Sequence, residues 1–334
     1  MSKAGQFGWV GLIAAKAIRL VLVLLTVAIV AFALTKNSPI DPINAYLGAD
    51  IARVGPEQRA LIAEKWGLDQ PATTQFFRWA TNLMAGDLGY SMTYNAPVAD
   101  VLVSRFKASL PLMGLAWLLS GVLGFALGVI AGAFSGSWAD RVIRLYSYVL
   151  ASTPTFWLAI MLLVVFAVGL NWAPVCCAAP IGVLPEDVTL ADRARHLALP
   201  LMALSVLGIA QIALHTRAKM IEIMQSDYAL YAKAQGASRM DIALRHGARN
   251  AALPAVTVLF ASLGELFGGS VLAEQVFSYP GRGKATVEAG IRGDVPLLLA
   301  ITLALTFVVF LGNSIADLLY RLVDPRMASG ARIA

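Results

Sequence analysis

Charged residues are scarce in this sequence, and their scarcity limits the class of protein. Only 14% of the 334 residues are Asp, Glu, Lys or Arg, whereas 58% are hydrophobic and the mean hydropathy is +0.71. Soluble globular domains carry about 25% charged residues. The composition therefore excludes a soluble protein and predicts an integral membrane protein with several spans.

Cysteine and histidine are also rare, which limits metal and redox chemistry. Cys176 and Cys177 cannot form a disulfide framework, and a vicinal disulfide is geometrically strained, so we expect packed or free thiols. The three histidines, His196, His215 and His246, lack the spacing of metal ligands. We predict no metal site.

Catalytic motifs are missing as well. The nearest approach to a phosphate-binding loop, Gly281 to Thr286, lacks the Gly-x-x-x-x-Gly-Lys-Ser/Thr spacing. The sequence shows no nucleophile beside a base and no paired catalytic carboxylates. A membrane-embedded enzyme is therefore disfavoured, and we predict that this chain binds no cofactor and does not hydrolyse ATP.

Long apolar runs are abundant. A bilayer core about 30 Å thick requires roughly 20 apolar residues per helix. Glycines spaced by four in the second run predict close helix packing, and Pro154 predicts a kink in the third. Six runs approach the required length and predict an all-α protein with six transmembrane helices, at residues 18–34, 110–134, 146–170, 197–214, 251–272 and 296–319.

The first run also resembles a secretory signal, because Lys16 and Arg19 precede it and residues 31–33 form a small-x-small cleavage pattern. The run is about 17 residues long, which exceeds the 7 to 15 residues of a signal's apolar region. We therefore expect a retained first helix.

The distribution of charge explains the net charge of +6 without a nucleic-acid partner. Residues 1–19, 135–145, 215–250 and 320–334 together hold 14 basic and five acidic residues. The loops between them in the chain, residues 35–109, 171–196 and 273–295, hold 12 basic and 13 acidic residues. Excess positive charge on alternate loops predicts that the first set, with both termini, is cytoplasmic.

The long segment between the first two runs has the pattern of a folded structure. Apolar residues recur with helical spacing in 56–66, and Phe76, Phe77, Trp79 and Leu83 mark a second apolar face. We predict a small extracytoplasmic cap here. The predicted organisation is then a first helix with its cap (1–107), a helical core (108–322) that contains a cytoplasmic loop (215–250), and a cytoplasmic tail (323–334).

One polar, basic segment between the fourth and fifth runs carries the clearest functional signal. We predict a short helix at 227–235, a break at Gly236, a second helix capped by Ser238, and entry into the fifth span at Pro254. Small alanines beside two tyrosines would form a protruding surface of low relief that fits a cleft of another protein. The alternative is an amphipathic loop whose basic residues lie on acidic membrane lipids.

The residues Tyr228 to Gly236, followed by Arg245-His-Gly-Ala-Arg-Asn-Ala-Ala-Leu-Pro254, resemble the coupling loop of binding-protein-dependent ABC importer permeases. The glutamate of that family's Glu-Ala-Ala motif is absent, because Lys233 occupies the centre of the Ala-Lys-Ala triplet. Gly236 lies 18 residues before Pro254, an interval similar to that of the oligopeptide, dipeptide and nickel branch. Further similarity to this branch at 67–71, 86–91, 264–281 and 317–326 extends the resemblance over nearly the whole chain.

This resemblance implies the six-helix permease fold of type I ABC importers and a bacterial or archaeal inner membrane. It implies a second homologous permease, two ATP-binding subunits that hold ATP and Mg, an extracytoplasmic substrate-binding protein, and a peptide, nickel or metal-chelate substrate. The residues that it implies for coupling to the ATPase are Tyr228, Tyr231, Ala232, Lys233, Ala234, Gly236, Arg245, Arg249 and Pro254.

Two acidic residues are candidates for the translocation pathway. Glu265 lies inside the fifth apolar run, where a carboxylate is costly unless it is paired or faces water. We expect Glu265, together with Glu274, to line the pathway, with an internal structural hydrogen bond as the alternative. The rival function is a secondary transporter driven by an ion gradient, which predicts inverted repeats and matched ion-binding carboxylates. Neither is clear in the sequence.

Overall fold

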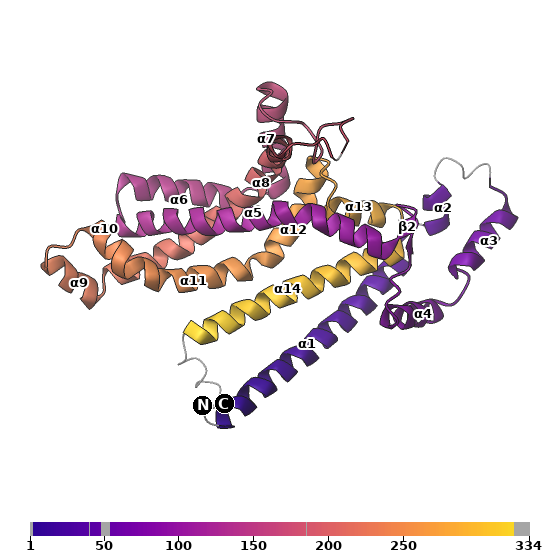
Figure 1. The fold of residues 1–334 in the computed structure, drawn as a ribbon, viewed down its shortest axis with the longest axis horizontal. Helices are drawn as coiled ribbons and strands as arrows, with labels where there is room; N and C mark the ends of the chain where they lie inside the picture. The colour runs from indigo at the N-terminus through magenta and orange to yellow at the C-terminus, as the bar shows by residue number, and fades with distance from the viewer. Residues whose placement is uncertain (1–2, 40, 48–53, 185, 324–334) are drawn as a thin grey trace. The chain divides into compact units, whose positions relative to one another are not determined.

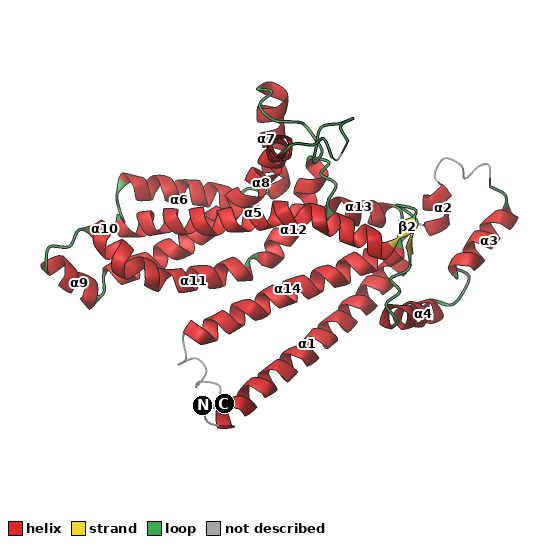
Figure 2. Cartoon of the chain, in the orientation of Figure 1, coloured by secondary structure: helices red, strands yellow, loops and turns green. Residues whose placement is uncertain are grey.

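The computed structural model describes residues 3–39, 41–47, 54–184 and 186–323, and this part of the chain is almost entirely helical (Figure 2). The motif residues 324–326 and the predicted tail after Val323 lie outside the described residues. A two-stranded antiparallel ribbon, β1 (Tyr90–Ser91) with β2 (Ala96–Pro97), precedes the second long helix. The helices are α1 (Lys3–Lys36), α2 (Pro42–Leu47), α3 (Pro56–Trp66), α4 (Ala72–Met84), α5 (Val98–Ala133), α6 (Trp138–Ala151), α7 (Thr155–Leu162), α8 (Leu190–Met224), α9 (Asp227–Ala234), α10 (Arg239–Ile242), α11 (Ala248–Ala261), α12 (Leu263–Val276), α13 (Arg282–Ile291) and α14 (Val295–Val323), with π-helical segments η2 (Leu163–Gly169) and η3 (Ala243–Gly247).

Among the described residues, α1, α5, α8 and α14 are long and apolar enough to cross a membrane (Figure 1). The third and fifth predicted spans are each broken into two helices. The pair α6 and α7 bends by 106°, and the run from Arg239 to Ala261 bends by 49° where it meets α12. By length and composition, the described part of the chain therefore offers four candidate spans, or up to six if each bent pair crosses the membrane as one.

The two breaks have different local causes. Pro154 separates α6 from α7 because a proline lacks the N–H that would continue the helical ladder, so the predicted kink becomes a full break. The break between α11 and α12 falls at Ser262, without a proline. The hydroxyl of Ser262 donates to the carbonyl of Leu259 at 2.9 Å, which gives that carbonyl a side-chain partner at the end of α11.

The chain divides into two compact units. The first contains Met1–Ser109 and Gly281–Phe310, and the second contains Leu110–Pro280 and the residues from Leu311 onward. In the first unit, α3 forms where helical spacing was predicted, and α4 carries the predicted second apolar face. Phe32 of α1 packs edge to face on Phe76 of α4, with ring centroids 5.2 Å apart.

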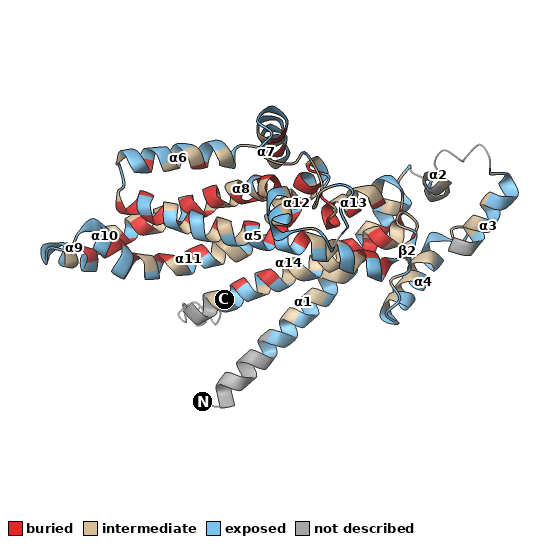
Figure 3. Cartoon of the chain, turned by 45° about the horizontal axis from the view of Figure 1, so that its top comes forward, coloured by how far each residue is buried: buried red, intermediate tan, exposed pale blue. Residues whose placement is uncertain are grey.

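The second unit is organised around α8, whose buried residues follow one another along most of its length (Figure 3). Glycines of α5 let α8 approach closely. A Cβ added at Gly124 would lie 2.8 Å from Ile212 Cβ and 2.9 Å from the Ile209 carbonyl oxygen. The predicted packing role of the second run's glycines is thus confirmed. They let the backbone of α5 lie directly against side-chain and backbone atoms of α8.

The prediction of packed or free thiols is wrong. Cys176 and Cys177 form a disulfide in the loop between η2 and α8. Cys177 N also donates to the carbonyl of Phe277 at 2.9 Å, which holds this loop to the end of α12.

Candidate functional site

The polar segment that follows α8 folds as a helix, a turn and a second helix. Ser226 lies between α8 and α9, and its hydroxyl donates to the Ile223 carbonyl at 2.6 Å. At the far end of α9, Gly236 adopts a left-handed conformation with φ of +89°. The N–H of Ala237 then reaches back to the Ala232 carbonyl at 3.1 Å, which closes the helix.

A capping box starts the second helix. The Ser238 hydroxyl accepts from the Asp241 N–H at 3.2 Å, and the Asp241 carboxylate accepts from the Ser238 N–H at 3.3 Å. Both the break at Gly236 and the cap at Ser238 lie where the sequence predicted them.

The α9–α10 segment is anchored by small or apolar side chains and exposes its polar and aromatic ones. Ala229, Ile242 and Ala243 are buried. Tyr231 is 67% exposed, and Tyr228, Lys233, Ala234 and Gly236 are exposed with it, whereas Ala232 is half-buried (Figure 3). Most of the predicted coupling residues therefore share an accessible surface.

The basic residues of the predicted coupling set lie further along the chain. Arg245 is exposed within η3, and Arg249 is exposed in the first turn of α11. Asn250 links this part back to α9, because its side-chain amide donates to the Tyr228 hydroxyl at 3.5 Å. Pro254 lies inside α11, which begins at Ala248, so the predicted entry into the fifth span falls within a continuous helix.

The segment rests on a buried apolar cluster. Met220 of α8 is fully buried, and it packs with Val129, Ala133, Ile223, Ala243 and Ala251. A Cβ added at Gly247 would lie 2.7 Å from the sulfur of Met220, so a larger residue there would require the Met220 side chain to move. The end of α8 and the coupling segment are therefore in direct contact.

An ion pair joins α8 to the first turn of α6. Arg217 donates from Nε to Asp140 Oδ1 at 2.5 Å and from its terminal nitrogen to Oδ2 at 2.9 Å. The Gly136 N–H donates to the same carboxylate at 2.8 Å, and the Asp140 side chain is only 1% exposed. Bidentate geometry of this kind is the strong form of an arginine–carboxylate contact.

The sequence interpretation missed this pair, although a signal for half of it was present. Asp140 follows Ser137 by three residues, the spacing of a helix cap, and Ser137 accepts from the Asp140 N–H. No feature of the sequence connects Asp140 to Arg217, which lies 77 residues further along the chain.

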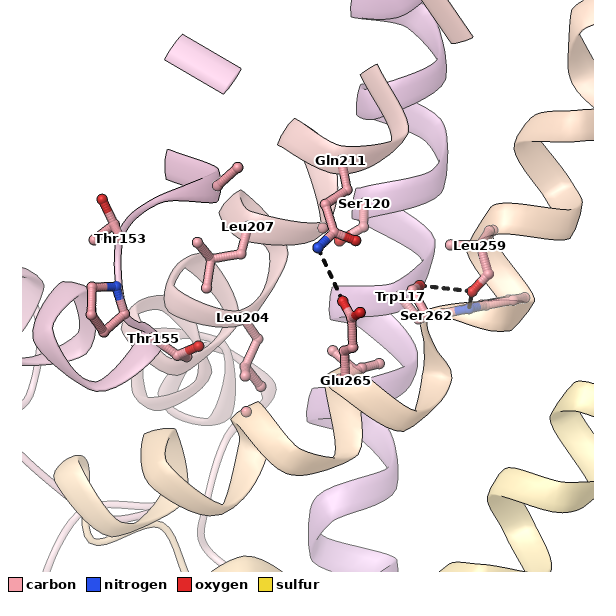
Figure 4. Close-up of a pocket in the computed structure, with 15 residues that line it drawn as sticks. Trp117, Ser120, Thr153, Thr155, Leu204, Leu207, Gln211, Leu259, Ser262 and Glu265 are labelled. Carbon is pink, nitrogen blue, oxygen red and sulfur yellow. Dashed lines mark hydrogen bonds between the residues drawn. The ribbon is translucent and has the colours of Figure 1, made fainter. Parts of the chain in front are cut away.

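A cavity of about 250 Å³ lies where both helix breaks meet (Figure 4). Residues from α5, α8 and α11 line it together with Thr153, Pro154 and Thr155 at one break and Ser262 at the other. Its wall is tied together at Leu259, whose carbonyl accepts from Trp117 Nε1 at 3.0 Å and from the Ser262 hydroxyl.

Glu265 lines this cavity and Glu274 does not. Gln211 donates from Nε2 to Glu265 Oε2 at 3.0 Å, and Figure 4 shows the two side chains facing each other. Glu274 is fully buried at the end of α12. Burial, and then the charge of Glu274, raise the pKa of the nearby Tyr279. The structure thus separates the two glutamates that the sequence grouped together.

Apolar helices long enough to span a bilayer, two bent pairs and a projecting polar segment define a multi-pass helical membrane protein. The chain belongs to the family of binding-protein-dependent transport system inner membrane components. Residues 124–329 match that family, and residues 10–113 match the N-terminal region of such membrane components. The chain is thus a transport component rather than an enzyme.

Named relatives cover nearly the whole chain. The oligopeptide transport system permease protein AppB of Bacillus subtilis is 32% identical over 306 residues, which are 91% of this chain and 95% of the relative. The di/tripeptide transport system permease protein DppB of Pseudomonas aeruginosa is 34% identical over 316 residues, which are 90% of this chain and 94% of the relative.

Proposed function

We propose that this chain is a permease subunit of an ATP-driven importer of di- and oligopeptides in a bacterial or archaeal inner membrane. The family match and the names of the two relatives support a peptide as the substrate. A nickel or metal-chelate substrate is less well supported. No group of three or more His, Cys, Asp or Glu side chains suited to a metal ion occurs among the described residues.

The α9–α10 segment is the surface that receives force from the ATP-binding subunits. The observation that carries this proposal is the combination of exposed Tyr231 and Lys233 with buried anchors at Ala229 and Ile242. Such a surface can enter a cleft of a partner while its base stays fixed to α8. Gly236 sets the angle between the two helices, and Arg245 and Arg249 extend the surface with positive charge.

The complete transporter contains a second permease, two ATP-binding subunits that hold ATP and Mg, and an extracytoplasmic substrate-binding protein. The charge distribution supports a cytoplasmic location for both termini and the α9–α10 segment, with the α3–α4 region outside as a cap. Glu265 lies on the translocation pathway, because it is the carboxylate of a cavity bordered by broken helices.

Isolation of the tagged chain from its native membranes in mild detergent tests this function. Mass spectrometry should identify an ATPase and a second permease, and the complex should hydrolyse ATP faster when the binding protein and a peptide are added. A chain recovered alone that transports in an ion gradient without ATP would contradict the proposal.

A further inference from the structure

The cavity bordered by the two helix breaks carries an inference about substrate chemistry, which rests on the proposed peptide import. We propose that this cavity binds an ammonium group of the transported peptide, with the Glu265 carboxylate as its counter-charge. The site lies wholly within the second unit of this chain.

The charge of the cavity wall favours a cation. Glu265 is the ionisable carboxylate among the lining residues, and no lysine, arginine or histidine lines the cavity with it. Gln211 donates to one oxygen of that carboxylate. The second oxygen has no partner recorded among the described residues and stays accessible to a ligand.

Three hydroxyl groups of the cavity wall, those of Ser120, Thr153 and Ser262, are arranged as acceptors. The Ser120 hydroxyl donates to the Ser205 carbonyl at 3.0 Å, and the Thr153 hydroxyl donates to the Val149 carbonyl at 2.7 Å. Ser262 and Trp117 both donate to the Leu259 carbonyl. Because each hydroxyl has used its proton, only its lone pairs are left for a ligand.

A ligand that complements such a wall must donate several hydrogen bonds and carry positive charge. An ammonium group has three donors and no acceptor, which fits this description. A bare transition-metal cation fits less well, because no histidine or cysteine lines the cavity.

The size of the cavity indicates how much of the substrate it holds. Pockets that enclose a whole drug-sized ligand measure roughly 300–1,000 Å³. At about 250 Å³ this cavity would accept one end of a peptide and leave the rest outside. The ammonium group could be the amino terminus or a lysine side chain, which share the same chemistry.

Peptide uptake by the full transporter, reconstituted with its binding protein, distinguishes the amino terminus from a lysine side chain as the source of the ammonium group. The probes are Ala-Ala, N-acetyl-Ala-Ala and N-acetyl-Ala-Lys, compared in the wild type and in E265Q. Dividing the wild-type rate by the variant rate for each probe cancels the preference of the binding protein, which is the same in both. We expect E265Q to lower uptake of Ala-Ala by about tenfold, the size expected when one charge-assisted hydrogen bond is lost, and to leave N-acetyl-Ala-Ala unaffected.

The outcomes distinguish failure of the inference from failure of the proposed function. If E265Q lowers the uptake of both alanine peptides equally, or lowers the uptake of none of the three probes, the ammonium site is excluded while peptide import stands. If the wild type imports no peptide at all, the proposed function itself fails. A loss with N-acetyl-Ala-Lys but not with Ala-Ala would assign the site to lysine side chains and overturn the amino-terminal assignment.

A second measurement does not depend on whether blocked peptides are imported. A cysteine introduced by T155C, in a chain whose Cys176 and Cys177 are replaced by serine, reports the charge preference of the cavity. We expect a cationic thiol reagent to react at least severalfold faster than an anionic one of similar size, and E265Q to abolish this preference. Equal rates with both reagents in the Glu265 protein would overturn the inference.

Discussion

Single residues decide the geometry of the coupling segment. Gly236 has φ of +89°, a conformation that costs a non-glycine residue roughly 1–2 kcal/mol. A Cβ at this position would meet no atom within 4 Å, so the cost of substitution is conformational rather than steric. Substitution is therefore expected to act by changing the angle between α9 and α10.

We predict that G236A lowers peptide-stimulated ATP hydrolysis and the recovery of the ATPase with the permease. The matched control is G182A. Gly182 also has a left-handed φ, of +84°, and open space around it, but it lies in the loop after η2. Co-purification and ATPase assays should show a loss with G236A and little change with G182A. An equal loss in both variants would show that general destabilisation is responsible.

The Asp140–Arg217 pair leads to a prediction of stability and coupling. Removing one partner of a buried ion pair costs on the order of 3 kcal/mol. D140N leaves Arg217 without its carboxylate, whereas R217Q leaves Asp140 with Arg144, whose Nε lies 3.7 Å from Oδ1, so its cost should be the smaller. We expect D140N and R217Q each to lower the Tm of the purified protein and to weaken coupling.

A double-mutant cycle in a thermal unfolding assay measures the interaction. The variant with both substitutions should lose less stability than the two single losses added together. Strict additivity would mean that the two side chains do not stabilise each other.

At the scale of elements, the contact between α5 and α8 depends on glycines that keep the helices close. A Cβ added at Gly128 would lie 2.5 Å from Thr216 Cβ and 2.7 Å from the Ala213 carbonyl oxygen. A backbone oxygen cannot rotate away as a flexible side chain can, so the helices themselves would have to separate.

We therefore predict that G128A destabilises the protein by about 1–3 kcal/mol, the usual cost of overpacking. G114A on the same helix is the control, because a Cβ there would meet nothing within 4 Å. Thermal unfolding in detergent should give a lower Tm for G128A and an unchanged or higher Tm for G114A. A similar drop in both would contradict a steric origin.

The elements with local sequence signals could be predicted. The apolar spacing in 56–66 marked α3. Gly236 marked the end of α9, and Ser238 marked the start of α10. The end of α8 could not be predicted from hydropathy, because its apolar run stops near Leu214 while the helical hydrogen bonds continue through polar residues to Met224. The break at Ser262 has no proline to mark it in the sequence.

The candidate site could be predicted only in part, for the same reason. The coupling residues are consecutive or nearly so, and their pattern is visible in the sequence. The cavity joins Glu265 to Gln211, which lies 54 residues earlier, and it excludes Glu274, which lies only nine residues later. Which polar residues face the cavity depends on how the helices pack and rotate about their axes. The one signal available in the sequence was a polar residue, Gln211, within an apolar run.

At the scale of the whole molecule, the predicted orientation in the membrane can be tested by labelling. In a chain whose Cys176 and Cys177 are replaced by serine, we expect Y231C to react with a membrane-impermeant thiol reagent from the cytoplasmic side alone. T74C in α4 should react from the opposite side alone. Labelling of both positions from one side would contradict the positive-inside orientation and the extracytoplasmic cap.

The glycine contacts and the helix breaks together determine how the second unit can move. Because Gly124 and Gly128 bring α5 against α8, we expect these two helices to behave as one rigid body. The bends at Pro154 and Ser262 are then the natural hinges, since helical hydrogen bonds are already interrupted there. Both hinges border the cavity that contains Glu265, so a rotation at either one changes the shape of that cavity without unfolding a helix.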